Sequence, residues 1–170
     1  KSTIAGALAA DSGAVRIRSD VERKRLAGMT PEQRSELQQR DLLYSAAMSR
    51  KTFSRLEDLA AIVIEAGFPA IIDATFLHRT TRDSFHRLAR RLSVPFVIID
   101  CSAPPEQLRQ RLIERARHAQ DASEADVAVM EQQLSSAQAL TQEEKIHRVA
   151  AASAEDGAML WQRVQALCFG

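Results

Sequence analysis

Cysteine is scarce in this sequence of 170 residues: the chain has only Cys101 and Cys168, far apart from each other. Their number and spacing exclude a disulfide framework and a cysteine metal site, and they predict a reducing, cytoplasmic compartment. Long hydrophobic runs are also missing, because the longest aliphatic stretch, residues 59–64, is too short to span a bilayer. We therefore expect no membrane partner.

An excess of charge of one sign is absent as well. The 23 Lys and Arg residues against 22 Asp and Glu residues leave a formal net charge of +1. Nucleic-acid-binding proteins usually carry a clear basic excess, so we expect no nucleic-acid partner. The four histidines show no metal-ligand spacing, and no Gly-x-Ser-x-Gly element is present. Hydrophobic residues make up 45% and charged residues 26%, which is typical of one globular domain over residues 1–170.

Apolar residues follow a pattern in which helices alternate with short strands. The spacing predicts helices over residues 2–12 and 46–66, and Thr80 with Asp83 forms a capping box that predicts the start of another helix. Short apolar runs predict strands over residues 15–19, 69–73, 95–101 and 148–151. This order indicates an α/β fold with a doubly wound parallel sheet of about five strands flanked by helices. Ligands of such sheets bind at the carboxyl ends of the strands.

The first three residues, Lys1, Ser2 and Thr3, match the end of the phosphate-binding motif Gly-x-x-x-x-Gly-Lys-Ser/Thr. In that motif the lysine reaches the β- and γ-phosphates, and the hydroxyl binds Mg²⁺. Such tripeptides are common, and the alternative interpretation is a disordered amino terminus. The position before a predicted helix, at the front of a βαβ chain, favours the motif. We expect the glycines and the first strand to lie in a segment ahead of Lys1.

Polar residues follow the predicted strands where a ligand would bind. Asp73 ends one strand and is a candidate ligand of Mg²⁺, or else it starts a turn. Thr75 is a candidate contact to the substrate or a residue that shapes the turn. Asp20 is a candidate base that orients an acceptor hydroxyl, and Arg23 a candidate site for an anionic part of the substrate. The alternative is a helix N-cap at Asp20 followed by solvated basic residues.

Arginines gather at two further places in the sequence. Arg111 and Arg115 are four residues apart on one predicted helix face, with Arg117 close behind. A lid over residues 110–126 that presents these arginines would neutralise charge on a transferring phosphoryl group. Arg79 and Arg82 lie near the end of a predicted strand and are candidate substrate contacts. In both places the alternative is an ordinary solvated face of a helix.

Taken together, the chain resembles the P-loop kinase superfamily. It is most similar to bacterial AAA-type ATP-binding kinase-like domains akin to gluconate kinase, chloramphenicol phosphotransferase, zeta toxin and polynucleotide kinase. The stretches that carry the resemblance are Lys1-Ser2-Thr3, residues 17–26, residues 71–76, residues 111–117 and residues 121–126. Many members follow an aminoglycoside-phosphotransferase-like domain, which implies an upstream domain in the same polypeptide as a possible partner.

The resemblance implies an activity and a set of site residues. ATP with Mg²⁺ would be the phosphoryl donor, and a hydroxyl of a small molecule the acceptor. Lys1 would bind the phosphates and Ser2 the metal, and Asp20 would be the acceptor base. Asp73 would be the acid of the second strand element, with Arg115 and Arg117 in the lid. Two alternatives remain: a regulatory module that binds or slowly hydrolyses ATP, and a nucleic-acid end kinase, which the near-neutral charge disfavours.

Overall fold

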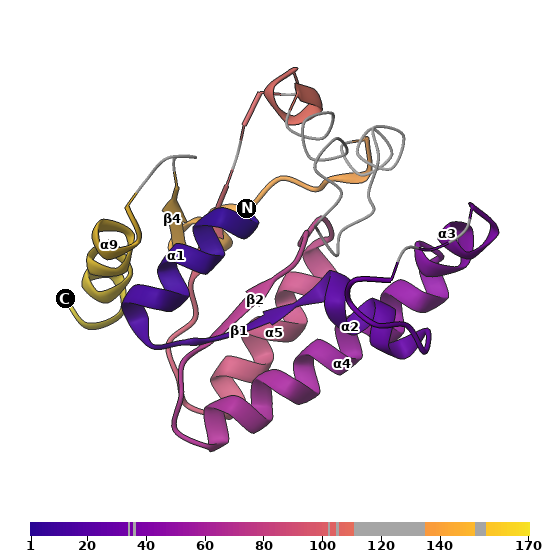
Figure 1. Cartoon of the computed structure of the whole chain (residues 1–170). Coiled ribbons are helices and arrows are strands. Elements are labelled where there is room, and N and C mark those ends of the chain that lie inside the picture. Colours follow the sequence, from indigo (N-terminus) through magenta and orange to yellow (C-terminus); the bar gives the residue numbers. More distant parts are fainter. Residues whose placement is uncertain (34, 36, 102, 105, 111–134, 152–155) are drawn as a thin grey trace.

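The structure is a computed structural model in which helices flank short parallel strands (Figure 1). It describes all residues except 34, 36, 102, 105, 111–134 and 152–155. The first elements in chain order are α1 (Ser2–Ser12), β1 (Val15–Arg18), α2 (Ser19–Leu26), α3 (Leu37–Leu43), α4 (Ala46–Glu65) and β2 (Ala70–Asp73). They are followed by α5 (Arg79–Arg91), β3 (Ile98–Asp100), α8 (Gln142–Lys145), β4 (Arg148–Ala150) and α9 (Gly157–Phe169).

The strands form two parallel pairs. β1 pairs with β2 in a register that sets Val15 opposite Ala70 and Arg18 opposite Asp73. β3 pairs with β4 over Ile98–Asp100. Of the sheet of about five strands that the sequence predicts, the described residues form four strands in two sheets. Parallel strands flanked by helices confirm the α/β class.

The edges of β2 and β3 that face away from their partners have no backbone partner among the described residues. The Ile98 amide donates to the His147 carbonyl at 2.8 Å. Because backbone groups alternate in direction along a parallel strand, the Ile99 amide points away from β4. The Pro69 carbonyl likewise accepts from Val15, so the same alternation turns the Ile72 amide away from β1.

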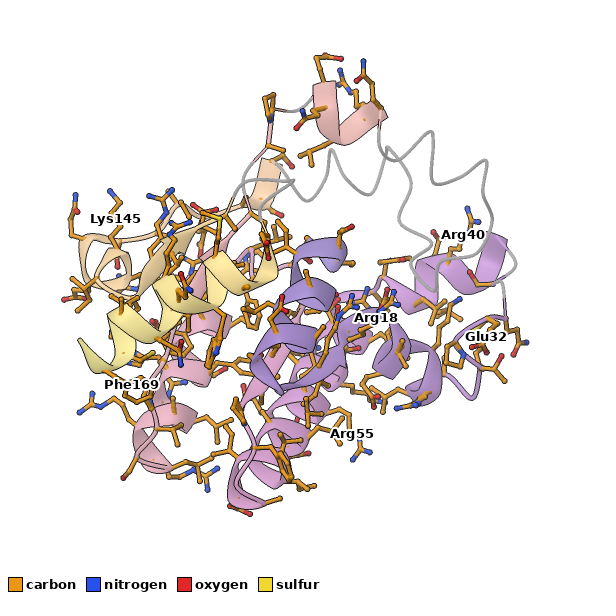
Figure 2. The ribbon with its side chains drawn as sticks, turned by 60° about the vertical axis from the view of Figure 1, so that its left-hand side comes forward. Arg18, Glu32, Arg40, Arg55, Lys145 and Phe169 are labelled. Carbon is orange, nitrogen blue, oxygen red and sulfur yellow. The ribbon has the colours of Figure 1, made fainter. Side chains whose placement is uncertain are left out.

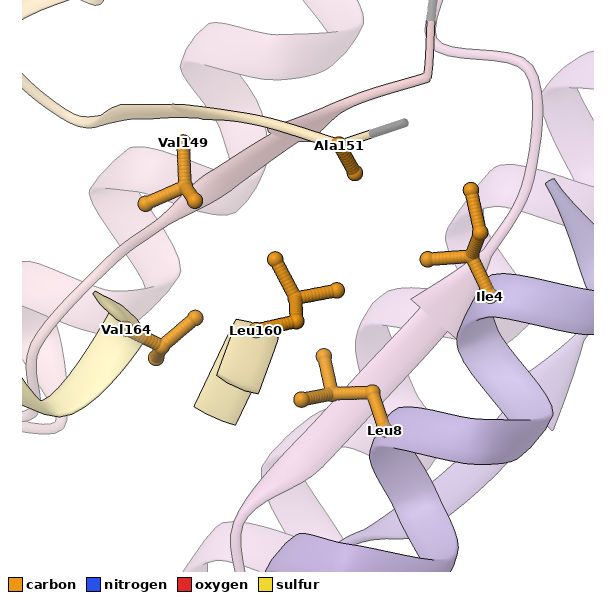
Figure 3. Close-up of a cluster of buried hydrophobic side chains, with 6 residues drawn as sticks. All are labelled: Ile4, Leu8, Val149, Ala151, Leu160 and Val164. Carbon is orange, nitrogen blue, oxygen red and sulfur yellow. The ribbon is translucent and has the colours of Figure 1, made fainter. Parts of the chain in front are cut away.

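Helices cover both faces of the strands. On one face, α1 packs against α9, and their apolar side chains meet β4 in a cluster of Ile4, Leu8, Val149, Ala151, Leu160 and Val164 (Figure 3). Ile71 and Ile99 pack against this cluster, which links β2 and β3 to the same core. Gly157 is required where α9 crosses α1, because a Cβ there would lie 2.7 Å from the Ala7 backbone.

The other face is covered by α4 and α5. Their core contains Ile17 of β1 with the helix residues Leu56, Phe85 and Leu88. Phe85 meets the ring of Phe76 edge-to-face, with centroids 5.0 Å apart. This second core fixes the amino-terminal strand pair against two long helices, so the carboxyl ends of β1 and β2 rest on a packed base. No helix in the described part of the chain is long and apolar enough to cross a membrane.

The predicted helix over residues 2–12 is confirmed, and one local prediction is wrong. Helix α1 ends at Gly13, whose φ of 67° lies in the left-handed region that favours glycine. The predicted capping box of Thr80 and Asp83 does not start α5. That helix begins at Arg79, whose amide donates to the Gln138 side chain at 2.7 Å, and its N-cap His78 forms no side-chain cap. A partner distant in sequence therefore replaces the local cap.

The unpaired strand edges generate the first testable prediction. We expect the amides of Ile72 and Ile99 to exchange with deuterium at least about tenfold faster than the Ile98 amide, because among the described residues only the Ile98 amide has a backbone acceptor. Hydrogen exchange followed by two-dimensional NMR resolves these three amides. Equal protection of Ile98 and Ile99 would show that another strand pairs with this edge, contrary to the described topology.

Candidate functional site

The carboxyl end of β2 holds a buried ionic cluster centred on Asp73. The Lys1 ammonium lies 2.7 Å from Oδ1, and the Arg16 guanidinium donates to Oδ2 through Nε at 3.2 Å and through Nη2 at 2.5 Å. Only 1% of the Asp73 side chain is exposed, against 42% of Lys1. Burial by itself would raise the pKa of Asp73, but the charges and hydrogen bonds of Lys1 and Arg16 outweigh it and hold this pKa below its ordinary value.

The local sequence explains why these three groups meet. Asp73 ends the apolar run of β2, so its carboxylate emerges at the carboxyl edge. Arg16 is in β1, opposite Ile71 in the register. Lys1 is the N-cap of α1, so its side chain lies at the amino end of a helix, where backbone N–H groups are unpaired. Asp73 therefore lies at the amino end of this helix, at the carboxyl edge of the strands where ligands of such sheets bind.

Asp20 lies at the same edge, at the start of α2. Its carboxylate accepts from Arg18 Nε at 3.1 Å and Nη2 at 2.7 Å, and from the Val21 amide at 2.9 Å. Arg18, labelled in Figure 2, is opposite Asp73 in the strand register, which places Asp20 just beyond the end of the strand pair. Its bidentate contact orients the carboxylate.

Helix α2 is held firmly on the body of the protein. Its buried Glu22 forms ion pairs with Arg25 at 2.5 Å and with Arg55 of α4 at 3.5 Å. Its buried Lys24 donates to the Pro31 carbonyl at 3.0 Å and to the Gln33 carbonyl at 2.6 Å. Ion pairs and hydrogen bonds on two sides of α2 thus keep Asp20 at a set position relative to the strands.

Arg23 lies one helical turn after Asp20. Its guanidinium carbon is 4.9 Å from the centre of the Tyr44 ring. Burial lowers the pKa of Arg23, against the raising effects of Tyr44 and Asp20. The Nε atom is buried and has no hydrogen-bond partner among the residues that the structure describes. A desolvated cation with an unused donor therefore sits beside the Asp20 carboxylate.

The end of β3 approaches the same edge. Burial raises the pKa of the Cys101 thiol, on which the charges of Lys1 and Asp73 also act. Cys101 follows directly on β3, so the carboxyl ends of β2 and β3 lie close enough for electrostatic interaction. Both ends therefore face one region, although these strands do not pair.

The other predicted site residues lie in varied surroundings. Thr75 is exposed just after β2, and Ser2 and Thr3 lie in the first turn of α1. Arg79 is half-exposed and paired with Asp83 at 3.5 Å and with Glu143 at 3.4 Å. Arg111, Arg115 and Arg117 lie outside the described residues, as does nearly all of the predicted lid over 110–126.

Arg82 is buried in a structural contact. Its guanidinium donates to Glu144 at 2.5 and 3.1 Å, and to the carbonyls of Phe76 at 2.9 Å and Ala139 at 3.3 Å. These bonds tie α5 to the segment before β4. The Glu144 carboxylate also closes a capping box with Thr141 at the start of α8. These partners occupy most of the hydrogen-bond donors of Arg82. The substrate contact that the sequence predicts for Arg82 stays a prediction.

Sequence reasoning missed Arg16 and Arg18, the partners of the two carboxylates. Their signal is the alternation Val-Arg-Ile-Arg of β1, which sets two arginines on one side of an otherwise apolar strand. This pattern does not show which carboxylate each arginine contacts, because that depends on the register between β1 and β2.

A cavity of about 280 Å³ lies between α5 and α8; Arg79 and Arg82 are among its lining residues, whereas Asp73 and Asp20 are not. His86, Phe96 and His147 line it, with the two imidazole centroids 4.8 Å apart. Burial, and then the charge of His86, lower the pKa of His147. Within the described ranges, no group of three or more His, Cys, Asp or Glu side chains is arranged to hold a metal ion by itself.

Comparisons with known proteins address the family and the fold. A family model described as an AAA domain matches residues 1–140. A gluconokinase from Sinorhizobium meliloti 1021 is similar in structure, with a TM-score of 0.63 and 16% identity over 98% of this chain and 83% of that chain. An unliganded sugar kinase from Janibacter sp. HTCC2649 has a TM-score of 0.62 and 20% identity over 98% of this chain and 86% of its own.

A search of curated proteins finds no match to the sequence. At identities of 16% and 20%, the similarity of the two solved structures shows a shared fold. The fold places the carboxyl ends of parallel strands at one edge, which is where Lys1, Asp73 and Asp20 lie.

The Arg82–Glu144 pair generates a prediction about stability. Hydrogen bonds from Arg82 lower the pKa of Glu144 from 4.5 to about 2. A depressed pKa in the folded state stabilises the fold above pH 4.5, and this contribution is lost as the pH falls toward 2. We expect Glu144→Gln to lower the free energy of unfolding by about 3 kcal/mol at neutral pH, and by less as the pH falls below 4.5.

Urea denaturation over a pH series measures this difference. The matched control is Glu143→Gln, because that side chain is 86% exposed and its removal should cost less than about 0.5 kcal/mol. An effect of Glu144→Gln that is the same at every pH would contradict a structural role for the ionised carboxylate.

Proposed function

We propose that this chain, which belongs to the AAA domain family, is an ATP-dependent phosphotransferase that moves the γ-phosphoryl group to a hydroxyl of a small molecule. The family match confirms the predicted resemblance. One observation supports the activity above the rest: the Lys1 ammonium, at the amino end of α1, lies 2.7 Å from the buried Asp73 carboxylate at the end of β2. Structural similarity to a gluconokinase and a sugar kinase supports a small-molecule acceptor.

Lys1 is the group that we assign to the phosphates of the donor. Its side chain is 42% exposed, so a ligand can reach it, while its partner Asp73 is buried. A polyphosphate offers the ammonium more negative charge than one carboxylate does. We infer that phosphate binding draws Lys1 away from Asp73, with Thr3 and the amide groups of the first turn of α1 facing the same anion.

Mg²⁺ would be held by the Ser2 hydroxyl and the Asp73 carboxylate together with the phosphates. A carboxylate and a hydroxyl are oxygen donors of the kind that Mg²⁺ prefers beside phosphates, so the residues fit the ion. When bound, the ion would neutralise charge on the β- and γ-phosphates. Asp73 has one oxygen for it once Lys1 turns to the phosphates, because Arg16 occupies only Oδ2.

Asp20 is the proposed base for the acceptor hydroxyl. Arg18 fixes one edge of its carboxylate through two hydrogen bonds, and α2 is anchored through Glu22 and Lys24. Holding the base still in this way orients the hydroxyl for attack. We propose that Arg23 and Thr75 face the acceptor. Arg79 and Arg82 are further proposed contacts to the acceptor, although both now form ion pairs with carboxylates.

The remaining assignments complete this proposal. In this proposal, residues 1–170 form one P-loop kinase-like domain, and the segment 110–126, nearly all of it outside the described residues, would be its lid. Arg111 would contact the nucleotide, and Arg115 and Arg117 would neutralise charge on the phosphoryl group in transfer.

The donor assignment is tested on Lys1. On a chain that carries the Gly-x-x-x-x-Gly loop ahead of it, we expect Lys1→Ala to weaken ATP–Mg²⁺ binding by about tenfold to a hundredfold, because one charge-assisted contact to phosphate is lost. Isothermal titration calorimetry measures the affinity. The control is Lys51→Ala, an exposed lysine on α4 that should leave it unchanged. An unchanged affinity in Lys1→Ala would remove Lys1 from the site.

The acceptor base is tested on Asp20. We expect Asp20→Asn to lower turnover by about 10²- to 10⁴-fold, because the variant keeps the shape but loses the base. ATP affinity should stay within about a factor of three, since this carboxylate does not touch the nucleotide in the proposal. Steady-state kinetics with an acceptor found by screening measures both, with the exposed Asp58→Asn as control.

Normal turnover of Asp20→Asn would show that the base is another group. If the only activity is slow ATP hydrolysis that does not depend on Asp20, the regulatory-module alternative replaces the kinase.

A further inference from the structure

Three aromatic rings line one part of the cavity between α5 and α8. His86 of α5 stacks on Phe96, with the ring centroids 5.0 Å apart and the planes at 19°. His147 meets both rings edge-on, at 4.8 Å from His86 and 5.8 Å from Phe96. The His147 carbonyl accepts from the Ile98 amide at 2.8 Å, just ahead of β3 and β4. A helix and a strand pair therefore hold the two imidazoles together.

The imidazoles of His86 and His147 have unused hydrogen-bonding capacity. Both side chains are half-buried, and neither forms a hydrogen bond to another residue in the part of the chain that the structure describes. Polar groups that folding removes from water almost always have a partner. Ring nitrogens that lack one beside a cavity are therefore available to a ligand.

The charges of this cavity are uneven along its length. Its charged lining residues are Arg79, Arg82, Asp83 and Arg90 of α5 and Glu143 and Glu144 of α8. At one end, Arg79 lies between the carboxylates of Asp83 at 3.5 Å and Glu143 at 3.4 Å. Arg82 is paired with Glu144. Arg90, at the other end, forms no ion pair with any described carboxylate, so this end is positive.

Arg90 lies close to the two imidazoles in the fold. It follows His86 by four residues, so both side chains leave the same face of α5 on consecutive turns. Burial lowers the pKa of His147, and the charge of His86 lowers it further. The free cavity therefore disfavours a proton on His147, and an anion bound beside the rings would favour one.

We propose that the Arg90 end of the cavity binds the phosphate group of a small phosphate ester through Arg90, His86 and His147. A guanidinium and two protonated imidazoles offer donors only, and a phosphate group has more acceptor oxygens for them than a carboxylate has. Phe96 and Ile146 supply apolar surface for the organic part of the ester. A volume of about 280 Å³ is at the low end for ligand sites and suits a small ester rather than a nucleotide.

This site is separate from the proposed kinase site. Phe96 and His147 precede β3 and β4, so they lie at the amino ends of these strands, whereas Asp73 lies at a carboxyl end. Arg90 comes eleven residues after Arg79, which is about 17 Å along the axis of α5. The inference therefore goes beyond the proposed phosphotransferase activity, and the ester is not the phosphoryl acceptor of that reaction.

An NMR titration of the imidazole signals tests the inference in the absence of nucleotide. The probes are glycerol 3-phosphate, inorganic phosphate and sulfate at constant ionic strength, with glycerol as the uncharged control. We expect glycerol 3-phosphate to move the signals of His86 and His147 to saturation and to raise the pKa of His147. Glycerol should move neither signal.

Sulfate separates the titration of the protein from that of the ligand. It stays a dianion between about pH 5.5 and about pH 8, whereas phosphate itself changes charge in this range. Protonated imidazoles attract the anion, so we expect sulfate to bind at least about tenfold more tightly at the lower pH. His147→Phe keeps a ring beside Phe96 but takes up no proton, and it should remove most of this pH dependence.

Variants of α5 locate the phosphate. Arg90→Met should weaken binding of glycerol 3-phosphate by about tenfold or more, and Arg90→Lys, which keeps the charge, should recover part of the loss. The matched control is Arg87→Met, which removes the same charge from an exposed position of the same helix that does not line the cavity. This control should stay within about twofold of the wild type.

Each outcome decides one part of the inference. Equal losses in Arg90→Met and Arg87→Met would show a response to net charge alone, and the site would be wrong. Inorganic phosphate binding as tightly as glycerol 3-phosphate would overturn the assignment to an ester. The absence of a saturable shift at both histidines would remove the site altogether. Because no nucleotide is present, failure of the kinase proposal leaves all of these results unchanged.

Discussion

The ionic cluster at the end of β2 is the contact on which the proposed site depends. Asp73 is almost fully buried, and the charges and hydrogen bonds of Lys1 and Arg16 outweigh this burial and hold its pKa below the ordinary value. The cluster joins the amino end of α1 to β1 and β2, so it fixes the distance between this end of the helix and the strand edge. The two cations of the cluster differ in exposure: the Arg16 side chain is mostly covered, whereas the Lys1 side chain is half-exposed. A phosphate ligand can therefore compete for Lys1 and leave Asp73 paired with Arg16, so that the buried carboxylate is never left without a cation.

The proposed site has a donor side and an acceptor side because α1 and α2 place different side chains at the same edge of the strands. Helix α1 presents Lys1 and its first amide groups, and helix α2 presents Asp20 and Arg23 one turn apart. The register that pairs Arg18 with Asp73 sets the two sides next to each other. Because α2 is tied to α4 and to the loop at residues 31–33, the acceptor side is held by contacts independent of those that hold Lys1. The two halves of the site can therefore be perturbed separately.

Features that depend on neighbouring residues were predictable from the sequence. Helix α1 with its stop at Gly13, helix α4 and the strand that ends at Asp73 follow from periodicity and from the turn preference of glycine. Features that depend on pairing across the chain were not. Arg16 and Arg18 meet their carboxylates through the strand register, Arg82 is buried by Glu144 far along the chain, and Gln138 caps α5 in place of Thr80. Charge in a sequence shows which groups need partners, and only the fold decides which partners they find.

The central claim is that nucleotide binds at the Lys1–Asp73 edge. Its most direct test is an NMR titration with ATP–Mg²⁺ of a chain that carries the expected glycine loop, following the Asp73 carboxyl carbon and the Lys1 side-chain nitrogen. We expect both signals to move together and to saturate, while the imidazole signals of His86 and His147 in the α5–α8 cavity stay in place. Movement of the histidine signals with no change at Asp73 and Lys1 would place the nucleotide elsewhere and contradict the account.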